Sequence, residues 1–230
     1  MRARIVEKGV PAAKVAVFPN WVDAAPPNAD GSAEGFRAAH GLSDKSLVVY
    51  SGSMGVKQGL ELVLDVAACA LEREDVRFLL AGDGPVRKEL ASAASRRGLA
   101  NITFLPPQSD EQYAALLAAA DLCLLPQRPE VRSLVMPSKV LRMLAGGVPI
   151  VAIADKESGL ADVIRRSGGG TVMERRDAPD VWATVRNLIA DGEARARMAS
   201  AGRRYAATHF DRDAVLTAYL DRLLTLTRDR

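Results

Sequence analysis

Residues 47–59 have the sequence LVVYSGSMGVKQG, in which an apolar run passes directly into a turn with three glycines. Four consecutive apolar residues, 47–50, are typical of a strand that is buried on both faces. Helical spacing then begins, with apolar side chains at Leu60, Val63, Leu64, Ala67 and Leu71. This succession of strand, turn and helix predicts one unit of a parallel sheet with helical crossovers.

The same alternation continues along the chain. We predict further strands at residues 76–80, 102–105, 122–125, 149–152 and 171–173. Pro85 suits the first position of one intervening helix, and Ser109 with Gln112 matches the capping box of another. Right-handed crossovers then give an α/β fold with a Rossmann-like, doubly wound parallel sheet, in which ligands bind beyond the carboxyl ends of the strands.

The composition disfavours several classes of protein. The 230 residues are 48% hydrophobic and 26% charged, an ordinary globular balance, and no apolar run is long enough to span a bilayer. The net charge of +3 is spread along the chain and aromatic residues make up 5%, which argues against a nucleic-acid partner. Cys69 and Cys123 lie in apolar runs, so we predict buried free thiols. His40 and His209 have no Ser or Cys partner at a strand end, so no nucleophilic triad is visible.

The two ends of the chain differ from the middle. Residues 15–18 look like a single strand, and residues 24–28 have the composition of a linker. A strand that enters a linker in this way suggests the tail of another domain. The last helix follows Asp211 and carries an apolar stripe that must pack against something, at Val215, Leu216, Tyr219, Leu220, Leu223 and Leu224.

The glycine-rich turn after the first strand is suited to binding an anion. Glycines let backbone N–H groups approach a phosphate, and the start of the following helix adds a positive partial charge. Lys57 adds a full positive charge. The spacing fits neither G-x-G-x-x-G nor the phosphate loop that ends in Gly-Lys-Ser/Thr, which disfavours a dinucleotide dehydrogenase or an ATPase. The residues alone support equally a tight turn with a solvated lysine.

A second turn between strand and helix contains Gly82, Asp83 and Gly84. The glycines permit close approach, and Asp83 can accept a hydrogen bond from a ligand hydroxyl or cap the helix. The residues favour the capped turn for Asp83. Arg87, one turn into the helix, fits a solvated surface charge equally well.

A third loop contains Gln127 and later Pro137, Ser138 and Lys139. Ser138 can cap the next helix, whose first N–H groups point to where a phosphate would sit, and Lys139 adds charge. The alternative is a helix cap with an exposed lysine. We favour a functional role, because this loop would face the glycine-rich turn across the crevice of the sheet.

Seven motifs in order carry a family resemblance. The chain resembles the carboxy-terminal half of retaining GT-B glycosyltransferases of glycosyltransferase family four, in the branch with colanic-acid and other bacterial exopolysaccharide or O-antigen transferases. The motifs are FPNWVD at 18–23, YSGSMGVKQG at 50–59, AGDGP at 81–85, NITFLP at 101–106, AD at 120–121, MPSK at 136–139 and LAGGVPIVA at 144–152.

The resemblance implies two Rossmann-like domains with the active site between them. The half present here would bind the nucleotide diphosphate of a sugar donor, which is the substrate, and no cofactor or metal is expected because cations stabilise the leaving group. Lys57 and Lys139 would be the catalytic cations. The nucleotide-sugar-binding residues would be Gly52, Ser53, Met54 and Gly55 as a backbone cradle, with Gly82, Asp83, Gly84, Arg87, Gln127, Pro137 and Ser138.

The resemblance also implies partners and a division of the chain. The acceptor would be a glycan or a lipid-linked glycan, and the protein would work in the cytoplasm at the inner face of the membrane, as a peripheral enzyme. Residues 1–28 would be a remnant of the amino-terminal domain with the interdomain linker, residues 29–208 the nucleotide-sugar-binding domain, and residues 209–230 a helix that packs against the amino-terminal domain or a separate partner chain that supplies it.

The chain departs from the family pattern at two places. The usual pair of glutamates is replaced at the aligned positions Leu134 and Arg142, and Ser53 stands where many members have a basic residue. Two other functions stay open: a split or truncated half that docks without catalysing, and a GT-B-fold nucleotide-sugar 2-epimerase. Such epimerases use several carboxylates and histidines in the cleft, which are scarce here.

Overall fold

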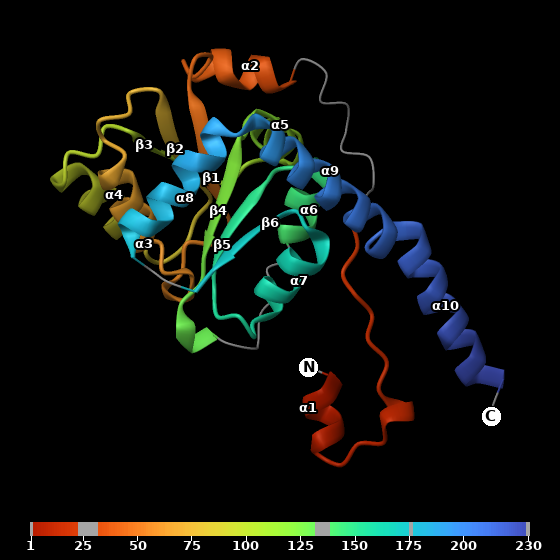
Figure 1. Ribbon diagram of the computed structural model, residues 1–230. Helices are drawn as coiled ribbons and strands as arrows, with labels where there is room; N and C mark the ends of the chain where they lie inside the picture. The colour runs from red at the N-terminus through yellow and green to blue at the C-terminus, as the bar shows by residue number, and fades with distance from the viewer. Residues whose placement is uncertain (1, 23–31, 132–138, 175–176, 229–230) are drawn as a thin grey trace.

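A six-stranded parallel sheet forms the centre of the protein (Figure 1). The computed structural model describes residues 2–22, 32–131, 139–174 and 177–228. The order of the strands across the sheet is β3-β2-β1-β4-β5-β6. Their bounds are β1 Ser46–Ser51, β2 Val76–Ala81, β3 Ile102–Leu105, β4 Leu122–Pro126, β5 Ile150–Ile153 and β6 Gly170–Met173. The predicted doubly wound α/β fold is therefore confirmed.

Helices cover both faces of this sheet. On one face α3 (Glu61–Cys69) packs against α4 (Arg87–Arg96) and α8 (Ala178–Ala190). On the other, α2 (Ser32–Ala39) packs on α5 (Asp110–Ala119), α5 on α6 (Lys139–Gly146), and α9 (Gly192–His209) on α6 and α7 (Gly159–Ser167). Because both faces are covered, the central strands are buried along their length, which is why they have continuous apolar sequences.

The apolar pattern explains the core. Phe78 in β2 is fully buried and lies 6.5 Å from Trp182 of α8, measured between ring centroids, so Trp182 is a packing residue. The capping box at the start of α5 is also present: the Gln112 N–H donates to Ser109 Oγ at 3.2 Å, and the Ser109 N–H to Gln112 Oε1 at 3.0 Å.

The chain reverses its winding between β1 and β4. The connection after β1 passes through η2 (Val56–Gln58) to α3 on one face, and the connection after β4 passes through η3 (Pro129–Val131) towards α6 on the other. Strands β1 and β4 are neighbours, with Val48 opposite Leu122. These two connections leave neighbouring strands in opposite directions, which is the topological switch point where ligands usually bind in this fold.

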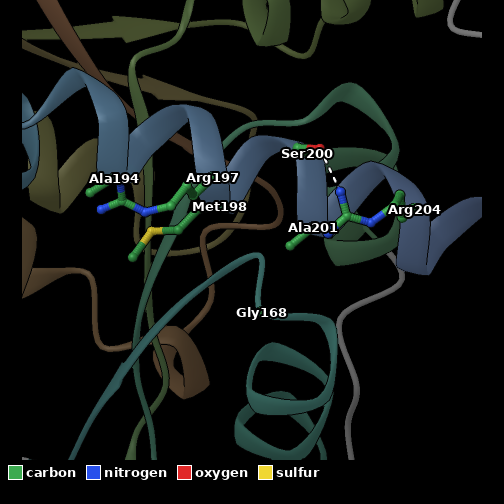
Figure 2. Close-up of a pocket in the computed structure, with 7 residues that line it drawn as sticks. All are labelled: Gly168, Ala194, Arg197, Met198, Ser200, Ala201 and Arg204. Carbon is green, nitrogen blue, oxygen red and sulfur yellow. Dashed lines mark hydrogen bonds between the residues drawn. The ribbon is translucent and has the colours of Figure 1, made fainter.

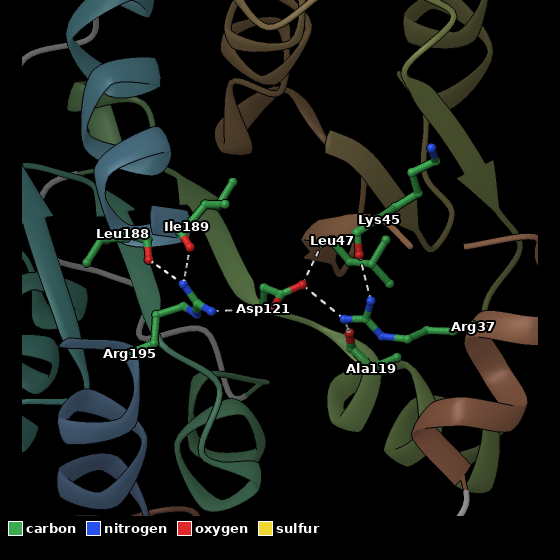
Figure 3. A network of polar contacts seen from close by, with 8 residues as sticks. All are labelled: Arg37, Lys45, Leu47, Ala119, Asp121, Leu188, Ile189 and Arg195. Carbon is green, nitrogen blue, oxygen red and sulfur yellow. Dashed lines mark hydrogen bonds and ion pairs between the residues drawn. The ribbon is translucent and has the colours of Figure 1, made fainter. Parts of the chain in front are cut away.

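Asp121, just before β4, holds the opposite edge of the sheet together (Figure 3). Its Oδ2 accepts hydrogen bonds from the Leu47 N–H and the Arg37 guanidinium, both at 2.9 Å, and its Oδ1 lies 4.0 Å from Arg195. The two arginines also donate to backbone carbonyls of Lys45, Ala119, Leu188 and Ile189. One carboxylate thus joins α2, β1, β4 and the junction of α8 with α9.

The two ends of the described chain run side by side outside the sheet. Helix α10 (Arg212–Arg228) points away from the domain, and the segment with α1 (Arg2–Glu7) and η1 (Ala12–Lys14) also lies outside it (Figure 1). Phe18 meets Tyr219 edge-on at 4.7 Å between centroids, and Arg222 donates to the Ala13 carbonyl at 3.2 Å. None of the helices described is both long and apolar enough to cross a membrane.

Three local predictions are wrong. Residues 15–18 form no strand, because no described strand lies beside them to share a hydrogen-bond ladder; only Val22 makes an isolated bridge, with Asp211. Cys69 is exposed, since it ends α3 on its solvent side, whereas Cys123 is buried as predicted. Pro85 lies in the turn before α4, two residues ahead of its first position.

Candidate functional site

A cavity of about 360 Å³ opens at the carboxyl ends of β1, β2 and β3. Turns after three strands and the faces of two helices supply its walls, so residues far apart in sequence meet there. The lining residues are Ser51, Gly52, Ser53, Ala81, Gly82, Asp83, Pro107, Gln108, Tyr113, Lys139 and Arg142. Five of the predicted site residues, Gly52, Ser53, Gly82, Asp83 and Lys139, are thereby brought together.

Two glycines allow the turn after β1 to pack directly on the turn after β2. Gly82 has φ +138°, and a Cβ built on it would lie 2.0 Å from the Gly52 carbonyl oxygen. Gly84 has φ +154°, and its Cβ would lie 2.4 Å from the Met54 carbonyl oxygen. Glycine is therefore required at both positions so that the two turns can pack against each other, and not in order to leave space for a ligand.

Because the two turns pack so closely, a methyl group at Gly82 should destabilise the fold. We expect Gly82→Ala to lower the free energy of unfolding by about 2 kcal/mol, because strain at a glycine-only backbone conformation is combined with a backbone clash. Gly98→Ala is the matched control, since Gly98 also has positive φ (+66°) but open space around it. Urea unfolding of both variants measures the difference; equal losses would contradict the loop-packing interpretation.

The glycine-rich turn offers few unused backbone donors. The Gly52 N–H donates to the Ala81 carbonyl at 3.0 Å, and the Met54 N–H to the Asp83 carbonyl at 2.8 Å. The Gly55 N–H donates to Gln58 Oε1 at 3.1 Å, and the Met54 side chain is buried in the core. In the described part of the chain the N–H groups of Ser53, Val56 and Lys57 in this turn have no acceptor. Of these three residues only Ser53 lines the cavity, which narrows the predicted cradle to one backbone donor at the cavity wall.

Of the two predicted catalytic lysines, the structure brings one to the cavity. Lys57 is exposed in η2, and its carbonyl accepts a hydrogen bond from the Arg128 N–H at 3.0 Å, which ties it to the residues that follow β4. Lys139 is the first residue of α6 on the other face of the sheet. Lys139 lines the 360 Å³ cavity, and Lys57 is not among the residues that line it.

Lys139 lies in a cationic and aromatic cluster. Its Nζ is 5.6 Å from the centroid of the Tyr113 ring, and the Arg142 guanidinium carbon is 4.5 Å from the same centroid. Burial, and secondarily the charge of Arg142, lowers the pKa of Lys139 below that of an ordinary lysine. Asp110 pairs with Arg142 at 2.7 Å but its side chain is 88% exposed. A cavity with two adjacent cations favours an anionic ligand.

The other predicted site residues lie in different surroundings. Asp83 accepts a hydrogen bond from the Gly84 N–H at 2.8 Å, so it stabilises its own turn while it also lines the cavity. Gln127 is buried, and its N–H extends the ladder to Ile153 at 2.9 Å. Arg87 begins α4, and its buried Nε has no hydrogen-bond partner among the described residues. Leu134, Pro137 and Ser138 lie outside the described residues.

Sequence reasoning missed six residues of the cavity wall. Four of them end strands or follow them, so their places at the carboxyl edge could have been found from the predicted strand ends: Ser51, Ala81, Pro107 and Gln108. Arg142 stands three residues after Lys139, a spacing that places both on one face of a helix. Tyr113 matched only the apolar pattern of α5, and no sequence signal indicated its proximity to Lys139.

A second hollow lies away from these residues, along α9 (Figure 2). It has a volume of about 470 Å³ and is lined by Gly168 at the end of α7 and by α9 residues Ala194, Arg197, Met198, Ser200, Ala201 and Arg204. Arg197 pairs with Glu193 at 3.6 Å, and Arg204 donates to Ser200 Oγ at 2.7 Å. None of the predicted site residues lines this hollow, so the cavity around Lys139 is the candidate site.

Comparisons with known proteins show the family of the chain. Residues 32–205 match the family of glycosyl transferases group 1, and the chain belongs to this family. It is 32% identical over 225 residues to WcaI of Escherichia coli (strain K12), named as a colanic acid biosynthesis glycosyl transferase, covering 96% of this chain and 54% of that protein. It is 30% identical over 165 residues to alpha-D-kanosaminyltransferase of Streptomyces kanamyceticus, covering 71% of this chain and 41% of that protein.

Solved structures show the same fold. The crystal structure of Anabaena Alr3699/HepE in complex with UDP-glucose has a TM-score of 0.81 at 21% identity, covering 97% of this chain and 61% of that chain. WaaG, a glycosyltransferase involved in lipopolysaccharide biosynthesis, has a TM-score of 0.71 at 23% identity over 88% of this chain and 55% of that chain. The architecture is thus one Rossmann-like half of the GT-B fold, and the chain spans about half the length of the curated relatives it matches.

Proposed function

We propose that this chain binds the nucleotide diphosphate of a sugar donor in the cavity around Lys139, as the donor-binding half of a glycosyltransferase. The observation that carries the proposal is the convergence of the Ser53 N–H, Lys139 and Arg142 on one cavity. Membership of the glycosyl transferase family and a fold shared with a protein solved in complex with UDP-glucose support it. The acceptor we propose is a glycan or lipid-linked glycan, as in polysaccharide synthesis.

The chemistry follows from where negative charge appears. In glycosyl transfer the bond between the anomeric carbon and the diphosphate oxygen breaks, and the diphosphate leaves with the bonding electrons. Cations and N–H groups held in place before the reaction stabilise that charge without reorganising. Lys139 and the Ser53 N–H would act from the cavity, and Lys57 from η2. Among the residues that the structure describes, Asp83 is the one carboxylate that lines the cavity, which supports transfer over an epimerase mechanism with several acids.

Calorimetric titration tests donor binding directly. UDP, GDP and their glucose and mannose conjugates are titrated into the chain, with UMP, GMP and inorganic phosphate as controls for charge alone. We expect one nucleoside diphosphate to bind well above its monophosphate. Failure of all the nucleotides to bind would overturn the proposal.

The pH dependence of this binding follows from the pKa of Lys139. Burial and Arg142 lower that pKa in the free protein, and a bound diphosphate favours the charged ammonium. Below the lowered pKa Lys139 is already charged and binding is strongest. As pH rises through the lowered pKa, binding must take up a proton and weakens, before an ordinary lysine with a pKa of about 10.4 would lose its charge.

The groups that face Lys139 are Arg142 on its own helix, Tyr113 and Asp110 on α5, and Asp83 across the cavity. Removing the neighbouring cation raises the pKa of Lys139. Arg142→Gln should therefore move the alkaline loss of UDP affinity to higher pH, measured by titrations across the alkaline range. An unchanged profile would contradict the assignment to Lys139.

We propose further that the amino-terminal half of the full transferase packs on the outlying ends of this chain. Exposed apolar side chains support this proposal: Val17, Phe18, Trp21, Tyr219, Leu220, Leu223 and Leu224. Without that half, the chain should bind donor but transfer no sugar. The second candidate function is a half that docks onto a partner without catalysing. Co-expression with an amino-terminal half distinguishes the two functions, because only the half of a transferase gains activity on assembly.

A further inference from the structure

Three side chains beside the cavity form a unit, and the proposed function states no separate role for two of them, Tyr113 and Arg142. The Tyr113 ring is buried, and two cations from successive turns on one face of α6 approach it, Lys139 and Arg142. Cations are attracted to the face of an aromatic ring, and the attraction grows when water is excluded. The ring therefore holds two like charges close together at the cavity wall, in spite of their mutual repulsion.

The hydroxyl of Tyr113 takes no part in this arrangement. It is buried and forms no hydrogen bond of normal geometry with the described residues. Burial is the main cause that raises the pKa of Tyr113, and Cys123 raises it further, whereas Arg142 and Ser51 lower it. Because the pKa is raised on balance, the phenol stays neutral. The aromatic ring, and not the hydroxyl, is thus the part of the side chain that the cations use.

Arg142 has a partner that is easily exchanged. Its only carboxylate partner among the described residues is Asp110, whose side chain is 88% exposed, while that of Arg142 is 42% exposed. Exposed ion pairs contribute little net free energy because water solvates both charges well. A phosphate in the cavity can compete for the same guanidinium, and the planar group can make two parallel hydrogen bonds to it.

We infer that Arg142 is a second phosphate-binding residue of the donor site, that Tyr113 is the positioning residue for both cations, and that Asp110 holds the guanidinium until the diphosphate arrives. This inference rests on the proposed function and deepens it. Lys139 and Arg142 can each pair with one phosphate of a diphosphate, whereas a monophosphate has a single phosphate group, so the pair selects diphosphates over monophosphates. Arg142 is also the residue that stands where the family pattern has a glutamate, which gives this chain a charge of opposite sign there.

Two variants with opposite expected effects test Arg142. Loss of a charge-assisted hydrogen bond in Arg142→Gln should weaken UDP binding by about tenfold, and UMP binding much less. Asp110→Asn removes the competing carboxylate and should tighten UDP binding by about twofold. The double variant should still bind UDP weakly. If its affinity for UDP returned to that of the unsubstituted chain, repulsion by the unpaired Asp110 carboxylate would explain the weak binding of Arg142→Gln, and the inference would be wrong.

Two substitutions of Tyr113 test the ring. Tyr113→Leu removes the aromatic face and should weaken UDP binding on the order of fivefold. Tyr113→Phe keeps the face and should bind UDP as well as the unsubstituted chain, with equal or higher thermal stability because a buried unpaired hydroxyl is gone. If Tyr113→Phe lost as much affinity as Tyr113→Leu, the hydroxyl would be the ligand contact and the positioning role would be overturned.

The readouts separate this inference from the proposed function. If the unsubstituted chain binds neither UDP nor GDP, the proposed function itself fails. If it binds a nucleoside diphosphate but Arg142→Gln leaves the ratio of diphosphate to monophosphate affinity unchanged, only the inference fails. Thermal unfolding of each variant confirms that altered binding does not reflect loss of fold.

Discussion

Lys139→Ala is expected to weaken UDP binding by about 10- to 100-fold, which is the loss of about 1.5–3 kcal/mol for hydrogen bonds between charged groups. The effect should be large because Lys139 lines the cavity and holds its charge next to a buried ring, where water screens it less than at an open surface. The fold should tolerate the change, since the aliphatic stem lies at the start of α6 and its ammonium pairs with no carboxylate among the described residues.

A lysine at the opposite edge of the sheet provides the control. Lys45 precedes β1, and within the described ranges its ammonium pairs only with the exposed Asp44, at 3.0 Å. Lys45→Ala removes the same formal charge from the chain but leaves the cavity unchanged, so UDP should bind as before. Equal losses in the two variants would indicate that net charge, and not the position of Lys139, governs binding.

Asp121→Ala is expected to lower the free energy of unfolding by about 3 kcal/mol, the range for removing one partner from a largely buried ion network. The Asp121 side chain is 24% exposed, and those of Arg37 and Arg195 are 21% and 25% exposed. The substitution leaves both guanidinium groups with carbonyl partners but without a counter-charge, and it removes the acceptor of the Leu47 N–H. Urea unfolding followed by circular dichroism measures the loss.

The same variant separates stability from function. Asp121 lies at the amino edge of the sheet and the cavity lies at the carboxyl edge, so UDP affinity of the folded variant should change little. Asp162→Ala is the matched control, because Asp162 pairs with Arg166 at 3.7 Å on the surface, and its loss should cost under about 1 kcal/mol. A similar cost for both variants would contradict the structural role of Asp121.

Much of the fold could be predicted from the sequence because the central strands are buried on both faces. The apolar runs at residues 76–80 and 122–125 lie within β2 and β4, and the capping box at Ser109 marks the start of α5. The predicted strand at residues 15–18 failed because a short apolar run does not by itself supply a neighbouring strand. The AD motif at 120–121 supported the family resemblance, but only the structure shows that Asp121 joins four elements.

The candidate site was partly predictable, for a reason that lies in topology. Carboxyl ends of parallel strands meet at one edge, so Gly52, Ser53, Gly82 and Lys139 could be placed there together. Side-chain direction and pairing could not be read in the same way. No sequence pattern indicates that the Gly52 carbonyl oxygen occupies the position of a Cβ at Gly82. Nor does any pattern indicate that the Tyr113 ring contacts the two cations of α6.

The most direct measurement is a crystal structure of this chain with UDP bound. We expect the diphosphate to lie in the cavity, with its oxygens within hydrogen-bond distance of Lys139 Nζ and the Ser53 N–H, and with the Arg142 guanidinium turned from Asp110 towards it. A diphosphate bound elsewhere, such as in the hollow along α9, with no contact to Lys139, would contradict the assignment of the cavity as the donor site.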